Sequence, residues 1–167
     1  MNDRTLRGLA LYGALLATFG ETHAFCDQVV QNSDDAVAKG KPGRAGRAAC
    51  ARHVATYTAG QTTAAAAVTL TLGYRLPARA WLAGAAINAA THYVIDRRAP
   101  LVRFLRTRWV GKGGYLDHCT AQRRPGVVDT AGPGTALMEM DQATHRLIGV
   151  AAAAVTTWLA ARSDDRP

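Results

Sequence analysis

Histidine and aspartate recur in this chain as pairs separated by four residues. On an α-helix, residues at i and i+4 lie on one face with Cβ atoms about 5–6 Å apart, so each pair can direct both side chains at one cation. Imidazole together with carboxylate favours Zn²⁺, Mn²⁺ or Fe²⁺, and disfavours both soft thiolate chemistry and an all-oxygen calcium site. The pairs therefore predict a divalent metal site, and the choice among these ions stays open. The pairs are His23 with Asp27, His92 with Asp96, and Asp141 with His145.

The helices expected from hydropathy and turn residues place these pairs at one depth. In an up-down-up-down bundle, the ends of the odd helices and the starts of the even helices share one layer. His53 begins the uncharged part of the second helix, so it joins the same layer. The expected helices are residues 5–31, 45–74, 78–96 and 137–161. The seven predicted ligands are His23, Asp27, His53, His92, Asp96, Asp141 and His145.

Seven candidates exceed the four positions around one tetrahedral ion. They fit either two ions, or one ion whose histidines are oriented by further acids. Asp141 is predicted to be a ligand or the general base of a hydrolytic reaction, since two-metal centres suit the hydrolysis of phosphate esters. Neighbouring polar side chains on the same helices are expected to orient the ligands or to meet a substrate. These supporting residues are Gln31, Tyr57, Thr91 and Gln142.

The same residues also have a plain structural interpretation. Acids near helix starts cap amides, and histidines near helix ends cap carbonyls, so Asp141 can be an N-terminal acid. His92 and Asp96 can form a simple helix-surface pair. The Asp-His-Cys sequence at 117–119 offers a further ligand group, but it lies in an irregular basic segment. The three cysteines include no C-x-x-C pair, so we expect small idle thiols and assign them no redox role.

Composition predicts an all-α fold in a single domain of 167 residues. Apolar residues make up 49% of the chain, but alanine dominates them and aromatic residues are only 7%, which favours closely packed helices over a β-sandwich. Residues 54–74 form a run of 21 without a charged side chain, which is long enough to cross a bilayer. The prediction is an antiparallel four-helix bundle embedded in a membrane, with long basic loops after the first and third helices. A soluble bundle is the alternative.

The formal charge of +8 predicts an anionic partner, either lipid headgroups or nucleic acid. The loops at residues 32–52 and 97–140 contain thirteen Lys and Arg residues, against six on the other side of the bundle. Such an excess marks the cytoplasmic face. We therefore predict an inner-membrane protein with its metal site towards the cytoplasm and an uncleaved first helix. Residues 97–136 are predicted to be a basic loop insertion, and 162–167 a flexible tail.

Four motifs combine these residues: His23-x-x-x-Asp27-x-x-x-Gln31, His53-x-x-x-Tyr57, Thr91-His92-x-x-x-Asp96 and Asp141-Gln142-x-x-His145. Together they resemble a family of small bacterial membrane proteins called domain of unknown function 3307. The likeness covers residues 22–147 at the motif positions, and it implies a helical membrane fold without naming a substrate. Gln28 departs from the aromatic residue that commonly follows the first aspartate in that family, and the basic segment is longer. A weaker likeness links the chain to inner-membrane-associated metal-dependent hydrolases.

These patterns lead to one main functional hypothesis and two alternatives. The first is a membrane-bound metal-dependent hydrolase that acts on phosphorylated or lipid-like substrates drawn in by the basic loops. The second is a metal-binding or transport protein without catalysis, although transport predicts ligands near the bilayer midplane and these lie at one end of the bundle. The third binds nucleic acid or a protein partner through the arginine-rich loops, although no helix-turn-helix or zinc-finger pattern is present.

Overall fold

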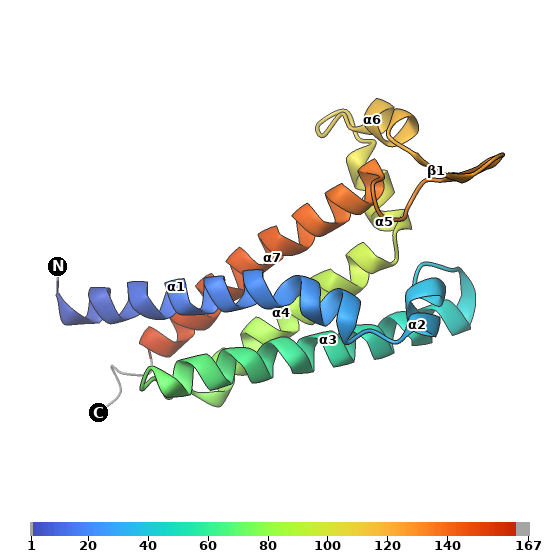
Figure 1. Cartoon of the computed structure of the whole chain (residues 1–167). Coiled ribbons are helices and arrows are strands. Elements are labelled where there is room, and N and C mark those ends of the chain that lie inside the picture. Colours follow the sequence, from blue (N-terminus) through green and yellow to red (C-terminus); the bar gives the residue numbers. More distant parts are fainter. Residues whose placement is uncertain (1, 163–167) are drawn as a thin grey trace.

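Four long helices form an antiparallel bundle in the computed structural model, which describes residues 2–162 (Figure 1). Around the bundle, the first helix contacts the second and the fourth, and the third helix contacts the same two neighbours. The first long helix starts and the last one ends at the same end of the bundle, beside the turn at residues 72–77, and the longer connecting segments gather at the other end (Figure 1). The all-α prediction is confirmed. The long helices are α1 (Asp3–Ala24), α3 (Gly43–Thr71), α4 (Ala78–Asp96) and α7 (Ala136–Ala161).

Local chemistry explains where these helices begin and end. The Asn2 side chain accepts a hydrogen bond from the Thr5 amide at 2.9 Å and caps the start of α1. Pro77 precedes α4, whose predicted limits of 78–96 are confirmed. The helix predicted over 45–74 ends earlier, at Thr71, because Gly73 takes a left-handed φ of 79° that stops the helix.

The first helix differs from the prediction of a continuous helix over residues 5–31. Regular α-geometry ends at Ala24, and a π-helical turn, η1 (Phe25–Val29), follows it. A π-helical turn contains one more residue per hydrogen-bonded ring than an α-helical turn, so it changes the direction of the side chains that follow. Asp27 lies in this turn and is buried.

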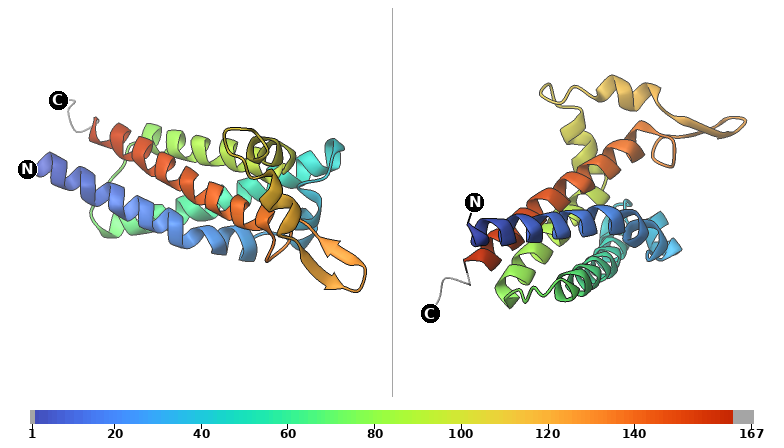
Figure 2. Two further views of the ribbon diagram at one scale, coloured as in Figure 1. Left: turned by 90° about the horizontal axis from the view of Figure 1, so that it is seen from above. Right: turned by 60° about the vertical axis from the view of Figure 1, so that its left-hand side comes forward.

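The connections contain more regular structure than the predicted loops. Loops were expected after the first and third helices, whereas the structure has three short helices and a hairpin there, near the end of the bundle opposite the start of α1 (Figure 2). The two strands pair antiparallel, with Ala121 opposite Asp129 and a left-handed Gly126 in the turn. Of the predicted tail, residues 163–167 lie outside the described residues. The elements are α2 (Ser33–Ala38), α5 (Ala99–Leu105), α6 (Gly113–His118), β1 (Ala121–Arg124) and β2 (Val127–Asp129).

Two apolar clusters stabilise the molecule, one on each side of the predicted polar layer. Along α7, Ala136 belongs to the cluster under α5 and α6, whereas Ala152 and Ala160 belong to the cluster at the chain-terminus end. His145 lies between them and is also buried. The layer of histidines and aspartates therefore interrupts one core rather than lying on its surface.

Small residues bring the helix backbones close together. A Cβ placed on Gly84 of α4 would lie 2.1 Å from the Thr156 hydroxyl oxygen of α7. A second polar layer lies deeper in the bundle, where the Gln61 amide donates to the Phe19 carbonyl at 2.8 Å and accepts from Asn88 at 2.9 Å. These bonds link α1, α3 and α4 and fix how the helices align.

Among the described residues, none of the helices combines the length and the apolar character needed to span a bilayer. The uncharged run in α3 is long, but alanine, threonine and glycine are its main residues and contribute little hydropathy per residue. The expectation that this segment qualifies as a membrane span is therefore not supported.

We expect Gly84→Ala to lower the free energy of unfolding by about 1–3 kcal/mol, because overpacked methyl groups force neighbours apart. The Thr156 hydroxyl cannot turn away freely, since it donates to the Ala152 carbonyl at 2.8 Å. Gly13→Ala is the matched control: nothing lies within 4 Å of a methyl group placed there, so the substitution should stabilise α1 slightly. Thermal unfolding measures both variants, and equal melting temperatures would contradict the close α4–α7 contact.

Candidate metal centre

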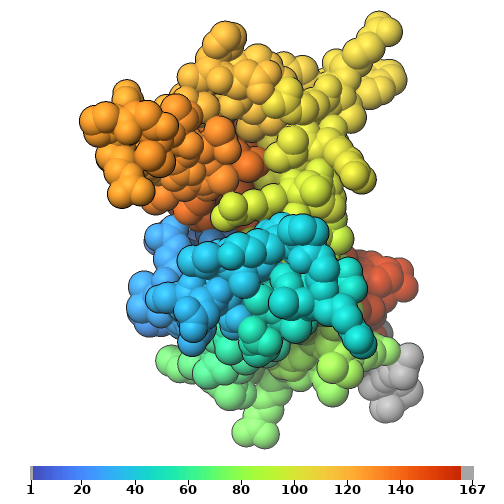
Figure 3. Space-filling model, turned by 90° about the vertical axis from the view of Figure 1, so that its right-hand side faces the viewer, coloured from blue at the N-terminus to red at the C-terminus, as the bar shows by residue number. Residues whose placement is uncertain are grey.

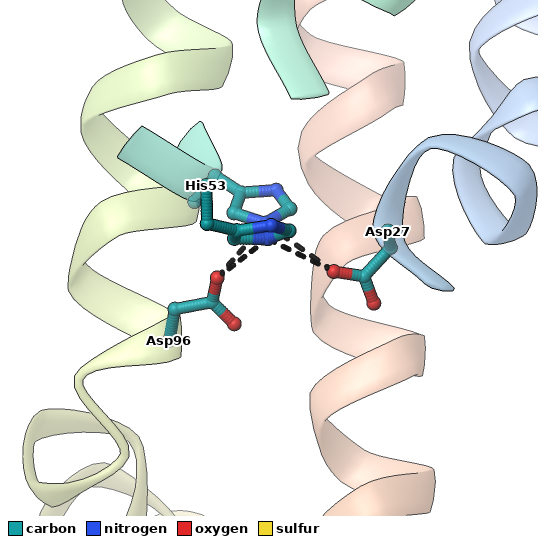
Figure 4. Close-up of side chains that lie close together, drawn as sticks. Asp27, His53 and Asp96 are labelled. Atoms are coloured by element: carbon teal, nitrogen blue, oxygen red, sulfur yellow. Dashed lines mark hydrogen bonds and ion pairs between the residues drawn. The ribbon is translucent and has the colours of Figure 1, made fainter. Parts of the chain in front are cut away.

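Four buried side chains from three elements direct ligand atoms at one point. Asp27 comes from the π-helical turn, His53 from α3, and His92 and Asp96 from successive turns of α4. Each offers one ligand atom, and these four atoms all lie within 4.8 Å of one another. Figure 4 shows Asp27 and Asp96 approaching His53 from opposite sides. The predicted convergence of these four residues is therefore present, and the cluster could hold a metal ion.

The spacing of the four atoms matches a tetrahedral metal site. The Nε2 atom of His53 lies 3.1 Å from Asp27 Oδ1, 3.0 Å from Asp96 Oδ2 and 3.0 Å from His92 Nε2. The Nε2 atom of His92 lies 3.6 Å from Asp27 Oδ1 and 3.1 Å from Asp96 Oδ2. Ligands about 2.0–2.1 Å from a tetrahedral ion lie roughly 3.3–3.4 Å from one another. Four of the five distances lie 0.2–0.4 Å below that value and one lies slightly above it, so the spacing is close to that of a tetrahedral site.

Hydrogen bonding alone does not account for this arrangement. A neutral imidazole carries one hydrogen, and His53 Nε2 has four polar atoms within 3.3 Å, since Lys39 Nζ also lies at that distance. The Nδ1 atoms of His53 and His92 are buried without a hydrogen-bond partner in the described part of the chain. Both rings thus direct their interactions through the nitrogen that faces the cluster.

The outer carboxylate oxygens are held by two further side chains. The Gln142 amide of α7 donates to Asp27 Oδ2 at 2.9 Å. The ammonium of Lys39, the residue that caps α2, lies 3.0 Å from the outer oxygen of Asp96, Oδ1, and 3.5 Å from Asp27 Oδ1, which itself faces the cluster. Partners of this kind orient metal-binding carboxylates and leave their other oxygens free to face an ion. Lys39 was not predicted, because it follows a short helix in a segment expected to be loop.

His23 belongs to the layer but has a different role from the four ligands. Its Nδ1 lies 2.8 Å from the Tyr57 hydroxyl, and its Nε2 lies 3.0 Å from Gln142 Oε1. Since Gln142 donates through nitrogen to Asp27, its oxygen accepts, which assigns the His23 hydrogen to Nε2. Burial lowers the pKa of His23, which favours this neutral form. The chain Tyr57–His23–Gln142–Asp27 therefore supports the centre, and both His23 nitrogens already have partners.

The charges of the cluster compensate one another. Burial alone would raise the pKa of Asp27 and of Asp96, but the contacts with His53 and His92 and the charge of Lys39 hold both pKa values well below their usual range. Burial opposes charge on the two rings as well, yet Asp27 and Asp96 outweigh it and raise the pKa of both His53 and His92. The negative charge of the two carboxylates is thus balanced by the protons on the imidazole rings and by the Lys39 ammonium.

A second group of possible ligands shares Asp96. It consists of Asp96, Asp141 and His145, whose ligand atoms also lie within 4.8 Å of one another. The Asp141 carboxylate lies 3.2 Å from His145 Nδ1, and His145 Nε2 is buried with no hydrogen-bond partner in the described chain. Asp96 would therefore be the common carboxylate if two ions were bound.

A cavity of about 330 Å³ gives access to the carboxylates. It is bounded by the α2 segment on one side and by the turn between the hairpin and α7 on the other, and Figure 3 views this end of the molecule. Lys39 and Arg98 also line it, as does Gln31, whose side-chain oxygen is buried and unpartnered among the described residues. Its polar lining residues are Asp27, Gln28, Gln31, Lys39, Asp96, Arg98 and Asp141.

The remaining predicted residues divide into two groups. Tyr57, Gln142 and Gln31 lie at the centre or its cavity, as expected of supporting residues. Thr91 does not reach the centre, because its hydroxyl donates to the Ile87 carbonyl of its own helix at 2.6 Å. The alternative ligands at 117–119 lie apart from both ligand groups: Asp117 pairs with Arg106, and His118 is exposed.

Comparisons of the chain with family models, with curated proteins and with solved structures found no match. The resemblance to domain of unknown function 3307 therefore stays a prediction, and the geometry of the site is the basis on which a function can be proposed.

We expect metal binding to release protons and to weaken as the pH falls. The raised pKa values keep His53 and His92 protonated to a higher pH than free imidazole, whose pKa is about 6.5, and an ion binds only the neutral ring. Affinity should therefore rise with pH until both rings are neutral, by about tenfold per pH unit for each proton released. Calorimetry in buffers of different ionisation enthalpy measures the protons released. His118→Gln should behave like the wild type, and an affinity independent of pH would contradict this account.

Proposed function

We propose that this chain is a metal-dependent hydrolase acting on phosphate esters, with one ion held by Asp27, His53, His92 and Asp96. The observation that carries the proposal is the convergence of four buried ligand atoms beside a cavity lined by two of the ligands themselves. The histidine and carboxylate donors suit Zn²⁺, Mn²⁺ or Fe²⁺. The formal charge of +8 and the basic connectors near the cavity favour an anionic substrate.

A divalent ion in such a site would supply Lewis acidity and would lower the pKa of a bound water. Asp141, which lines the same cavity and is only partly buried, is placed to accept the proton of that water. In the proposed reaction the water oxygen forms a bond to phosphorus, the ester P–O bond breaks, and the leaving alkoxide takes up the proton that Asp141 accepted from the water. Asp141 is thus the proposed general base, unless it binds a second ion together with Asp96 and His145.

A metal site without catalysis is the second candidate function. Four protein ligands around one ion are typical of structural zinc sites, whereas catalytic sites generally use three and leave a position for water. Against this stands the cavity, which a purely structural site does not need. The two candidates differ in what they predict for substrate turnover, so one set of variants separates them.

The test is metal content, measured by mass spectrometry on purified wild type, His92→Ala, Asp27→Ala and a His118→Ala control. Wild type and control should contain one or two equivalents of Zn, Mn or Fe per chain, and the two ligand variants should lose them while keeping their helical circular dichroism. Hydrolysis of p-nitrophenyl phosphate by the metal-loaded proteins should follow metal content.

Asp141→Asn distinguishes the two candidate functions. Loss of a general base costs about 10²–10⁴-fold in rate, so this variant should keep the first ion and lose most of its kcat. Stoichiometric metal without any turnover by the wild type would favour the structural candidate. Absence of metal after reconstitution would overturn both.

An association with the inner membrane is a further part of the proposal, and it does not require any helix to cross the bilayer. Its support is the uncharged middle of the bundle together with large apolar side chains on the outer faces of the long helices. These exposed residues include Leu9, Leu70, Leu82, Leu147 and Trp158.

Fractionation tests this location. The expressed chain should sediment with membranes through a high-salt wash, because apolar contacts with lipid do not weaken with ionic strength. Release by salt alone would assign the association to the basic connectors instead. Recovery in the supernatant without any treatment would contradict the membrane location.

A further inference from the structure

Arg98 has the most unusual backbone geometry in the described chain. It is the one non-glycine residue with positive φ among residues 2–162, at φ 55° and ψ −50°. The Ala99 amide donates to the Arg97 carbonyl at 2.6 Å, so Arg98 is the central residue of a γ-turn between α4 and α5. Positive φ at the centre of a γ-turn is rare and strained, and strain of this kind persists only where the surroundings enforce it.

The neighbouring residue supplies that enforcement. Arg97 donates from its guanidinium to the Lys39 carbonyl and, at 2.6 Å, to the Lys41 carbonyl. These bonds tie the end of α4 to the connection between α2 and α3. The chain must then turn within one residue to enter α5, and Arg98 is the residue that makes the turn.

The side chain of Arg98 lies across Gly40, next to the residue that carries the buried ammonium. A Cβ on Gly40 would be 2.9 Å from Arg98 Cδ and 3.2 Å from its Nε. Arg98 and Lys39 both line the 330 Å³ cavity at the metal centre. Within residues 2–162 the Arg98 guanidinium takes part in no ion pair, whereas Arg52, Arg106 and Arg123 each pair with an aspartate.

We propose that Lys39 and Arg98 form an anion subsite that binds the phosphoryl group of the substrate. The substrate class is accordingly a phosphate monoester, either on a small soluble molecule or on a lipid headgroup. Three positive groups would act in one cavity, beside the carboxylates of Asp27, Asp96 and Asp141: the ion of the proposed function, the Lys39 ammonium and the Arg98 guanidinium, which is unpaired within the described residues. A phosphate monoester offers three non-bridging oxygens to them, whereas a carboxylate offers two. Arginine binds such oxygens in a bidentate way, and lysine acts as a point charge.

This inference refines the proposed function, but its test is independent of turnover. Inorganic phosphate is titrated into metal-loaded protein by calorimetry, and the metal content of every sample is measured alongside. Arg98→Gln should weaken phosphate binding about 10–100-fold, as expected for lost hydrogen bonds to a charged group, without changing metal content. Arg98→Lys should weaken it less. Arg103→Gln, an exposed arginine of the same basic segment that does not line the cavity, should bind like the wild type.

Two further variants separate binding from folding. Gly40→Ala should also weaken phosphate binding, because its methyl group displaces the Arg98 side chain without removing any charge. Arg98→Gly should keep or raise the melting temperature, since glycine relieves the strained φ, and should still lose phosphate affinity. Wild-type phosphate affinity in Arg98→Gln or in Arg98→Gly would overturn the subsite.

The two sources of the phosphoryl group are compared directly. Glycerol 3-phosphate competes with inorganic phosphate in solution if the substrate is soluble. Vesicles of phosphatidylcholine containing phosphatidic acid bind the wild type and not Arg98→Gln if it is a lipid. Phosphate binding that depends on Arg98 in a chain that takes up no metal would overturn the hydrolase while keeping the subsite. If neither inorganic phosphate nor the phosphatidic acid vesicles bind the metal-loaded wild type, the subsite is overturned while the metal centre is kept.

Discussion

Two carboxylates buried at the centre of a small bundle determine what the rest of the chain has to provide. Asp27 and Asp96 are only 4% and 2% exposed, and removing an ionised carboxylate from water costs several kcal/mol unless charges and hydrogen bonds replace the lost hydration. The replacement comes from His53, His92 and Lys39, which belong to α3, α4 and the end of α2. The helices must therefore assemble together, because each one carries part of the compensation that the others need.

The surrounding architecture meets this requirement by close packing rather than by large apolar side chains. Alanine and glycine on α4 and α7 let the backbones approach, and this brings short side chains such as aspartate within reach of facing helices. The second polar layer at Gln61 and Asn88 then limits the alignment of the helices, since a shift along the axis would leave buried amides unpaired. Alignment and site geometry are consequently set by the same few polar contacts.

Much of this arrangement could be predicted from the sequence, because it depends on helical periodicity. The limits of α4 and the shared depth of His53, His92 and Asp96 follow from spacing and from Pro77. Lys39 could not be predicted, since its position depends on how a short helix folds back over the bundle. The bridging role of Gln142 was equally hidden, because one amide side chain links two helices that are far apart in sequence.

Two expectations that the structure does not support have a common physical origin. Thr91 has the right spacing for the site, but its hydroxyl donates a hydrogen bond to the backbone of its own helix, as helical threonines often do. The sequence does not show which of the two contacts a threonine makes. Similarly, the uncharged alanine and threonine in α3 resemble a membrane span by length and absence of charge, while their hydropathy is too low. In both cases the residue types narrow down what a segment can contact, but they do not decide what it does contact.

The π-helical turn at Phe25–Val29 has a consequence for how such a centre can be gained or lost over time. A π-helical turn is equivalent to an α-helix with one residue inserted. Deleting Phe25 or Cys26 would restore regular helix and rotate Asp27 by about 100° relative to the rest of α1. Asp27 would then no longer face His53, although every ligand remained in the chain. One codon in the gene thus separates ligands that converge on one point from the same ligands facing apart.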